Sequence, residues 1–152
     1  MKHFKVNEKD TINSEKLKRK WIKQINNIEL TNKAVANYQF NDGLIDHDAD
    51  LAWQNGTLQL MEFVSMDYLT GKSIQNRCFT TLGQMNALSE SRDFKSTYVM
   101  NKPQKKELHK KYDSAKTLIR RQKNTRTILE EDSEIEKFFA TIEYEAKPGA
   151  FK

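Results

Sequence analysis

Apolar residues recur along the chain with two different periods, and each period predicts one type of element. Leu17, Trp21 and Ile25 recur every four residues, which predicts a helix from about Ser14 to Glu29. The same helical spacing predicts three later helices, over Lys72–Ser89, about Lys105–Lys123 and about Ile135–Tyr144. Most of the predicted helical residues therefore lie in the second half of the chain.

Alternation of apolar and polar residues predicts strands between these helices. Ile45–Trp53 and Thr57–Met66 flank Asn55-Gly56, a dipeptide typical of hairpin turns. A β-prone segment, Val35–Phe40, precedes this hairpin, and Lys95–Asn101 is a further strand. The order helix, three strands, helix, strand, two helices predicts an α/β fold with a mixed central sheet, a β-hairpin in its core and flanking helices. We expect a single domain over residues 1–152, with a basic helical region at about 103–144.

Carboxylates are concentrated on the predicted hairpin. Asp46, Asp48 and Asp50 alternate along one side of its first strand, and Glu62 lies on its second strand. A two-residue turn at Asn55-Gly56 would pair Glu62 with Ala49 and point it away from Asp50, whereas a three-residue turn or a bulge would place both on one side. The sequence leaves both registers open. A charged outer face on an edge strand is the alternative explanation for the three aspartates.

The element order and these acids resemble the PD-(D/E)XK nucleases, whose core is a hairpin that bears an Asp and then Glu-x-Lys, followed by a helix and a strand. The resemblance covers about residues 14–101. It makes Asp50 the motif aspartate and Glu62 the second acid, with Val64 at the lysine position.

A magnesium site is what this resemblance implies, with Asp48, Asp50 and Glu62 as oxygen ligands. Mg²⁺ in such a site lowers the pKa of a bound water and neutralises charge on the phosphate. Valine cannot replace the lysine, which orients the nucleophile and stabilises the developing charge. Either a residue of the following helix has taken over, with Lys72, Arg77 and Gln84 as candidates, or the site is inert.

Basic residues cluster near the end of the chain. Ten lysines and arginines lie between Lys102 and Arg126, against only Glu107 and Asp113. If this stretch forms one helix, its solvent side can follow a phosphate backbone. We therefore predict contacts with DNA from Lys106, Lys110, Lys116, Arg120 and Lys123. A solvated helix of mixed charge is the plainer interpretation.

Composition narrows the class of protein only a little. Cys78 is the single cysteine, which favours a reducing compartment such as the cytoplasm. The longest apolar runs are far shorter than a membrane span, so no membrane partner is expected. His47 and His109 lack the spacing of zinc ligands and are interpreted as ordinary histidines.

Three hypotheses follow for function. The chain is a DNA-binding protein of phage or mobile-element type that acts as a Mg²⁺-dependent endonuclease, or it is a degenerate, non-catalytic relative of one. In the third hypothesis it is a regulator or inhibitor that binds another protein and uses no metal.

Overall fold

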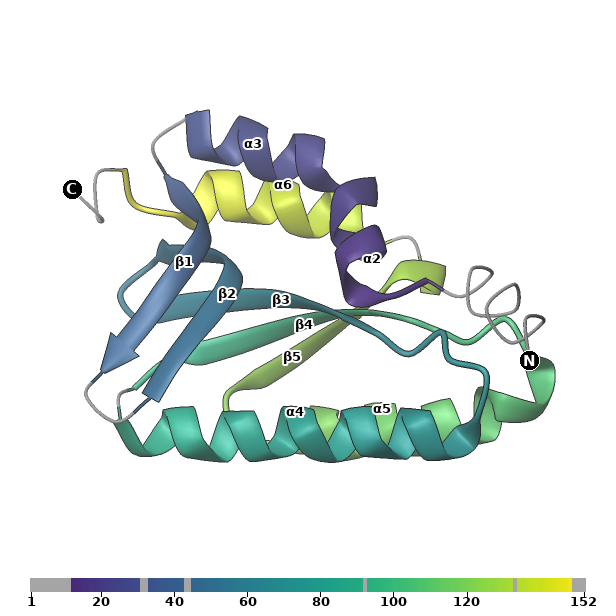
Figure 1. Cartoon of the computed structure of the whole chain (residues 1–152). Helices are drawn as coiled ribbons and strands as arrows, with labels where there is room; N and C mark the ends of the chain where they lie inside the picture. Colours follow the sequence, from purple (N-terminus) through teal and green to yellow (C-terminus); the bar gives the residue numbers. More distant parts are fainter. Residues whose placement is uncertain (1–11, 31–32, 43–44, 92, 133, 149–152) are drawn as a thin grey trace.

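Five strands form one mixed sheet in the computed structural model of this chain, which describes residues 12–30, 33–42, 45–91, 93–132 and 134–148 (Figure 1). The strands lie in sequence order across the sheet. Their bounds are β1 Ala34–Asp42, β2 Ile45–Gln54, β3 Leu58–Ser65, β4 Lys95–Asn101 and β5 Thr125–Leu129. The β1–β2 and β2–β3 pairs are antiparallel, whereas the β3–β4 and β4–β5 pairs are parallel. The predicted α/β class, with a hairpin inside a mixed sheet, is confirmed.

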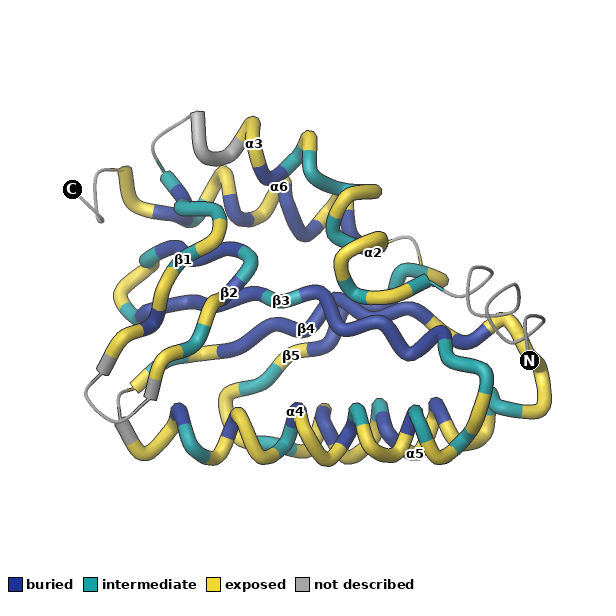
Figure 2. Tube along the Cα trace, viewed as in Figure 1, coloured by how far each residue is buried: buried dark blue, intermediate teal, exposed yellow. Residues whose placement is uncertain are grey.

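Helices cover both faces of the sheet (Figure 1). Their bounds are α2 Ser14–Lys20, α3 Ile22–Leu30, α4 Gly71–Ser91, α5 His109–Arg120 and α6 Ile135–Glu145, with short 3-10 turns η1 Lys106–Leu108 and η2 Glu130–Asp132. α2, α3 and α6 pack on one face through a cluster that includes Trp53 and Phe138. α4 and α5 cover the other face, where Tyr98 and Tyr112 are buried. Figure 2 shows the buried strands between two layers of half-exposed helices.

The predicted first helix is in fact two consecutive helices. α2 is capped by Asn13, whose side chain accepts a hydrogen bond from the backbone N–H of Lys16, and it ends at Lys20. Trp21 occupies the C-cap with ψ near 10°, and α3 begins at the next residue. Leu17 and Ile25 are fully buried, so the predicted apolar face is confirmed on both segments.

α4 has 21 residues, and its buried face agrees with the predicted one. Ile74, Cys78, Met85 and Leu88 are buried against the sheet. Within the described ranges, no helix combines the length and apolar character that crossing a membrane requires.

The predicted basic helix, about Lys105–Lys123, is confirmed up to Arg120, but the end of the basic segment belongs to a fifth strand that was not predicted. α5 ends at Arg120, and Asn124 adopts a left-handed backbone with φ of 59°. Asparagine tolerates this conformation and commonly ends helices in it. Thr125, Thr127 and Ile128 are β-branched, and β5 pairs in parallel with β4. Lys123 therefore lies in a turn and Arg126 in a strand.

Candidate functional site

The β2–β3 turn decides where the hairpin acids point. Gln54 pairs with Leu58, so Asn55, Gly56 and Thr57 form a three-residue loop. Gly56 has φ of 102°, a conformation that a side chain disfavours. The register from this loop runs to Leu51 opposite Met61 and ends there, one residue short of Asp50 and Glu62. Of the two turns left open by the sequence, the structure adopts the three-residue one.

Strand β2 leaves β3 at Asp50, and the side chain of Asp50 joins the two strands there. Its Oδ2 accepts a hydrogen bond of 2.7 Å from the backbone N–H of Phe63. Its Oδ1 lies 3.3 Å from Nζ of Lys18 on α2. The same ammonium donates to the side chain of Asn37 in β1. Lys18 therefore connects α2 to both β1 and β2, the two strands that form the outer hairpin of the sheet.

Glu62 has a different partner. Its Oε2 lies 2.8 Å from Nε2 of His47, which also belongs to β2. Both side chains are largely buried, with 17% and 12% of their surfaces exposed. Tyr98 on β4 lies in register with Glu62, and both Glu62 and Arg77 of α4 act on its hydroxyl electrostatically. We call the four residues Lys18, His47, Asp50 and Glu62 the hairpin cluster.

Burial and pairing shift the proton affinities in the hairpin cluster in a consistent way. Burial is the largest influence on Asp50 and raises the pKa of its carboxyl, although Phe63 N–H and Lys18 oppose it. The hydrogen bond to Glu62 raises the pKa of His47, with burial opposing and the nearby carboxylates adding to the rise. Two ion pairs, one of them dependent on His47 protonation, therefore compensate the buried acids.

A divalent cation does not fit the hairpin cluster as it is arranged. Mg²⁺ takes oxygen ligands with nearly octahedral geometry. Here both oxygens of Asp50 and one oxygen of Glu62 are already bound to protein groups. Within the described part of the chain, no three His, Cys, Asp or Glu side chains are grouped so as to hold a metal ion.

The remaining predicted site residues lie apart from the hairpin cluster. Asp48 is exposed on β2 and reaches His47 only through its charge. Lys72 and Gln84 are exposed on α4, and among the described residues no contact connects them to Asp50 or Glu62. Of the three α4 candidates, Arg77 is the one that acts on a residue beside the cluster, Tyr98.

Two members of the hairpin cluster were missed by sequence reasoning. Lys18 belongs to the polar side of α2, where lysines are usually solvated, and nothing in its local pattern indicates a partner 32 residues away. His47 was interpreted as an ordinary histidine. Its place between Asp46 and Asp48 was the available signal, because acids beside an imidazole favour its charged form.

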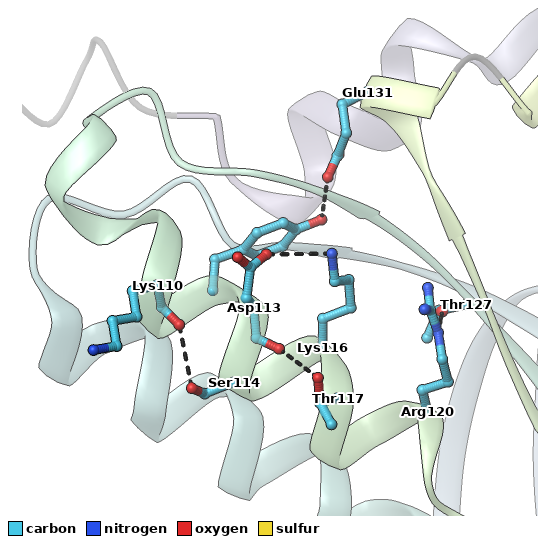
Figure 3. A network of polar contacts seen from close by, with 9 residues as sticks. Lys110, Asp113, Ser114, Lys116, Thr117, Arg120, Thr127 and Glu131 are labelled. Carbon is cyan, nitrogen blue, oxygen red and sulfur yellow. Dashed lines mark hydrogen bonds and ion pairs between the residues drawn. The ribbon is translucent and has the colours of Figure 1, made fainter.

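The basic segment, residues 102–126, is mostly exposed. Nine of its ten lysines and arginines are exposed, and Lys116 is the exception. Nζ of Lys116 lies 3.3 Å from Asp113 and over the ring of Tyr112. Nε of Arg120 donates a 2.8 Å hydrogen bond to Thr127 of β5. The backbone oxygen of Lys110 accepts a hydrogen bond from Ser114, whereas its side chain points away from the other residues drawn (Figure 3). Of the five predicted DNA contacts, Lys106, Lys110 and Lys123 are exposed without such a partner in the described chain.

Comparison with models of protein families, with curated proteins and with solved structures finds no match to this chain. Its own residues and their geometry are therefore the guide to its function.

Proposed function

We propose that the chain binds DNA through its basic segment and that it is a nuclease-like domain whose acidic site is held by protein cations. The exposure of nine of the ten basic side chains between residues 102 and 126 is the observation that carries this proposal. Only Glu107 and Asp113 oppose them within the segment, and Asp113 is paired with Lys116. The segment thus presents a surplus of positive charge to solvent.

A polyanion is the partner that such a surface suits best. Each phosphate that a lysine or arginine neutralises releases condensed counterions, so binding is favourable at low salt and weakens as salt rises. Contacts of this kind position a protein on the duplex without reading its sequence. We therefore expect similar affinity for unrelated DNA sequences.

The nuclease-like part of the proposal rests on strand order and on two residues. A helix, three antiparallel strands, a helix and a parallel strand follow one another, as in the PD-(D/E)XK core. Asp50 and Glu62 lie on adjacent strands, each one residue beyond the last β2–β3 pair, Leu51 and Met61. In this chain the ion pairs with Lys18 and His47 take the place of a metal.

Metal-dependent hydrolysis is the second candidate function, and one contact favours it. Lys18 places an ammonium 3.3 Å from Asp50, so this helix residue supplies the cation that Val64 cannot. Asp50 and Glu62 would have to release Lys18 and His47 before taking a cation. Calorimetric titration with Mg²⁺ or Mn²⁺ separates the candidates. Heat of binding in the wild type that is lost in Asp50→Asn supports metal-dependent hydrolysis. No heat of binding in the wild type supports a site whose acids stay paired with Lys18 and His47.

DNA binding is tested by fluorescence anisotropy with two unrelated duplexes and a single strand over a range of salt. The test variant replaces three exposed cations by Ala: Lys110, Arg120 and Lys123. We expect a loss of affinity for every sequence and a salt slope that flattens by about 0.9 for each phosphate contact removed.

A matched variant controls for charge alone. It removes one arginine and two lysines that are exposed on the opposite helical layer, at Arg19, Lys23 and Lys137. This control should keep most of the affinity. Absence of binding by the wild type at low salt, or equal losses in both variants, would refute the proposal and favour the protein-binding regulator.

A further inference from the structure

An apolar groove lies between α4 and α5 on the outer side of their layer. It has a volume of about 160 Å³. Phe79 and Leu118 form its walls and are 55% and 40% exposed, whereas Cys78 and Ala115 below them are buried. Sγ of Cys78 lies 3.7 Å from the carbonyl oxygen of Ala115, so small residues let the two helices approach closely here. The result is a hollow with apolar walls that faces solvent.

Positive charge surrounds this groove. Lys111 lines it directly. Lys72 lies on α4 one turn before another lining residue, Gln75, and Arg121 follows Leu118 by three residues; both are exposed. An occupant with an apolar side chain next to an acid would complement both the walls and the rim.

The opposite face of the molecule carries such a side chain. Tyr144 is 93% exposed near the end of α6, two residues after the buried Ile142 and therefore on the solvent side of the helix. Glu143 precedes it and is exposed, whereas the carboxylate of Glu145 accepts a hydrogen bond from Nε1 of Trp53. The described chain has three exposed large apolar residues, Phe79, Leu118 and Tyr144. The first two form the walls of the groove, and Tyr144 projects from α6.

We propose that this chain self-associates head to tail, with Tyr144 of one molecule inserted between Phe79 and Leu118 of the next. α6 and the α4–α5 layer cover opposite faces of the sheet, so one molecule cannot close the contact on itself (Figure 1). The two surfaces differ, and such a contact repeats into a ring or an open chain of molecules. Glu143 lies beside the inserted ring and faces the cationic rim of the neighbour.

The second molecule is favoured as occupant because both halves of the contact are present on one chain. A clustered pair of exposed apolar side chains marks an interaction site more often than scattered ones do. The groove is small, so the contact is weak and depends on protein concentration and on salt. It is independent of the proposed DNA binding and is tested without nucleic acid.

Sedimentation equilibrium of the full chain, up to about 1 mM protein, measures this association. The weight-average mass of the wild type should rise with concentration and fall back at high salt. Tyr144→Gln removes the inserted ring, and Leu118→Gln removes one wall. Both residues are exposed, so the fold is retained, and circular dichroism verifies this. The association constant of each variant alone should be lower than that of the wild type by about tenfold or more.

A mixture of the two variants gives the decisive result. Tyr144→Gln keeps an intact groove and Leu118→Gln keeps an intact tyrosine, so an equimolar mixture should form pairs and nothing larger. Wild-type protein at the same concentration should exceed the mass of a pair. A wild type that stays monomeric, variants that associate as it does, or a mixture that stays monomeric would each overturn the proposal.

Discussion

The side chain of Asp50 is expected to support the fold through its hydrogen bond more than through its charge. Two substitutions separate these contributions. Asp50→Ala removes the acceptor for the N–H of Phe63, a residue that is 2% exposed, and also the ion pair to Lys18. Asp50→Asn keeps an oxygen that can accept the same hydrogen bond and removes the charge alone.

The expected losses of stability differ severalfold. A buried N–H left without a partner costs about 1–3 kcal/mol, and Lys18 would also lose its carboxylate, so Asp50→Ala should cost about 2–4 kcal/mol. Burial raises the pKa of Asp50, which means that the folded state already disfavours its ionised form. Neutralisation by Asn should therefore cost less than about 1 kcal/mol.

Urea unfolding followed by tryptophan fluorescence measures both variants. With a slope of about 2 kcal/mol/M, Asp50→Ala should lower the midpoint by about 1–2 M and Asp50→Asn by less than about 0.5 M. Lys18→Met serves as the control for the ion pair. Equal shifts for Ala and Asn would refute the reasoning, because they would make the charge and not the Phe63 contact the stabilising element.

Two further predictions concern the hairpin. Pairing with Glu62 raises the pKa of His47 above 6.5, so the stability it contributes is complete below that pH and is lost as pH rises through the raised value. The urea midpoint should therefore fall between about pH 5.5 and about pH 8.5, and this fall should be larger in the wild type than in His47→Asn. An equal fall in both proteins would contradict this prediction. Gly56→Ala should destabilise the fold by about 1 kcal/mol, because Gly56 has a φ of 102°. Gly83→Ala should stabilise it by up to about 1 kcal/mol, because Gly83 lies on α4 with open space around it. Thermal unfolding of both variants measures whether the two effects have opposite signs.

Local patterns predicted most of the fold because each depends on neighbours in the sequence. The alternation in Thr57–Met66 and the Asn55-Gly56 turn located the β2–β3 hairpin. Apolar residues that recur every three or four positions from Ile74 located α4. β5 was missed because ten basic residues in 25 positions resembled a helix surface and hid Thr125–Leu129. Asn124 was the local signal that the helix had ended.

The candidate site was less predictable, because its geometry depends on one loop residue and on a distant helix. The β2–β3 register depends on a turn of three residues instead of two, a choice that Asn55-Gly56 does not determine. Lys18 reaches Asp50 only because α2 packs across β3. Tertiary packing of this kind has no local periodicity to reveal it.

The early departure of β2 from β3 also divides the sheet into parts of unequal local stability. β2 pairs with β1 along nearly its whole length but with β3 only from Leu51 to Gln54. An outer hairpin attached so briefly is a natural unit of partial unfolding, opening at a lower free energy than the β3–β5 core and exchanging its amide protons sooner. Asp50 and His47 would move with it, so solvent access to the buried acids is governed by the opening equilibrium of a single hairpin.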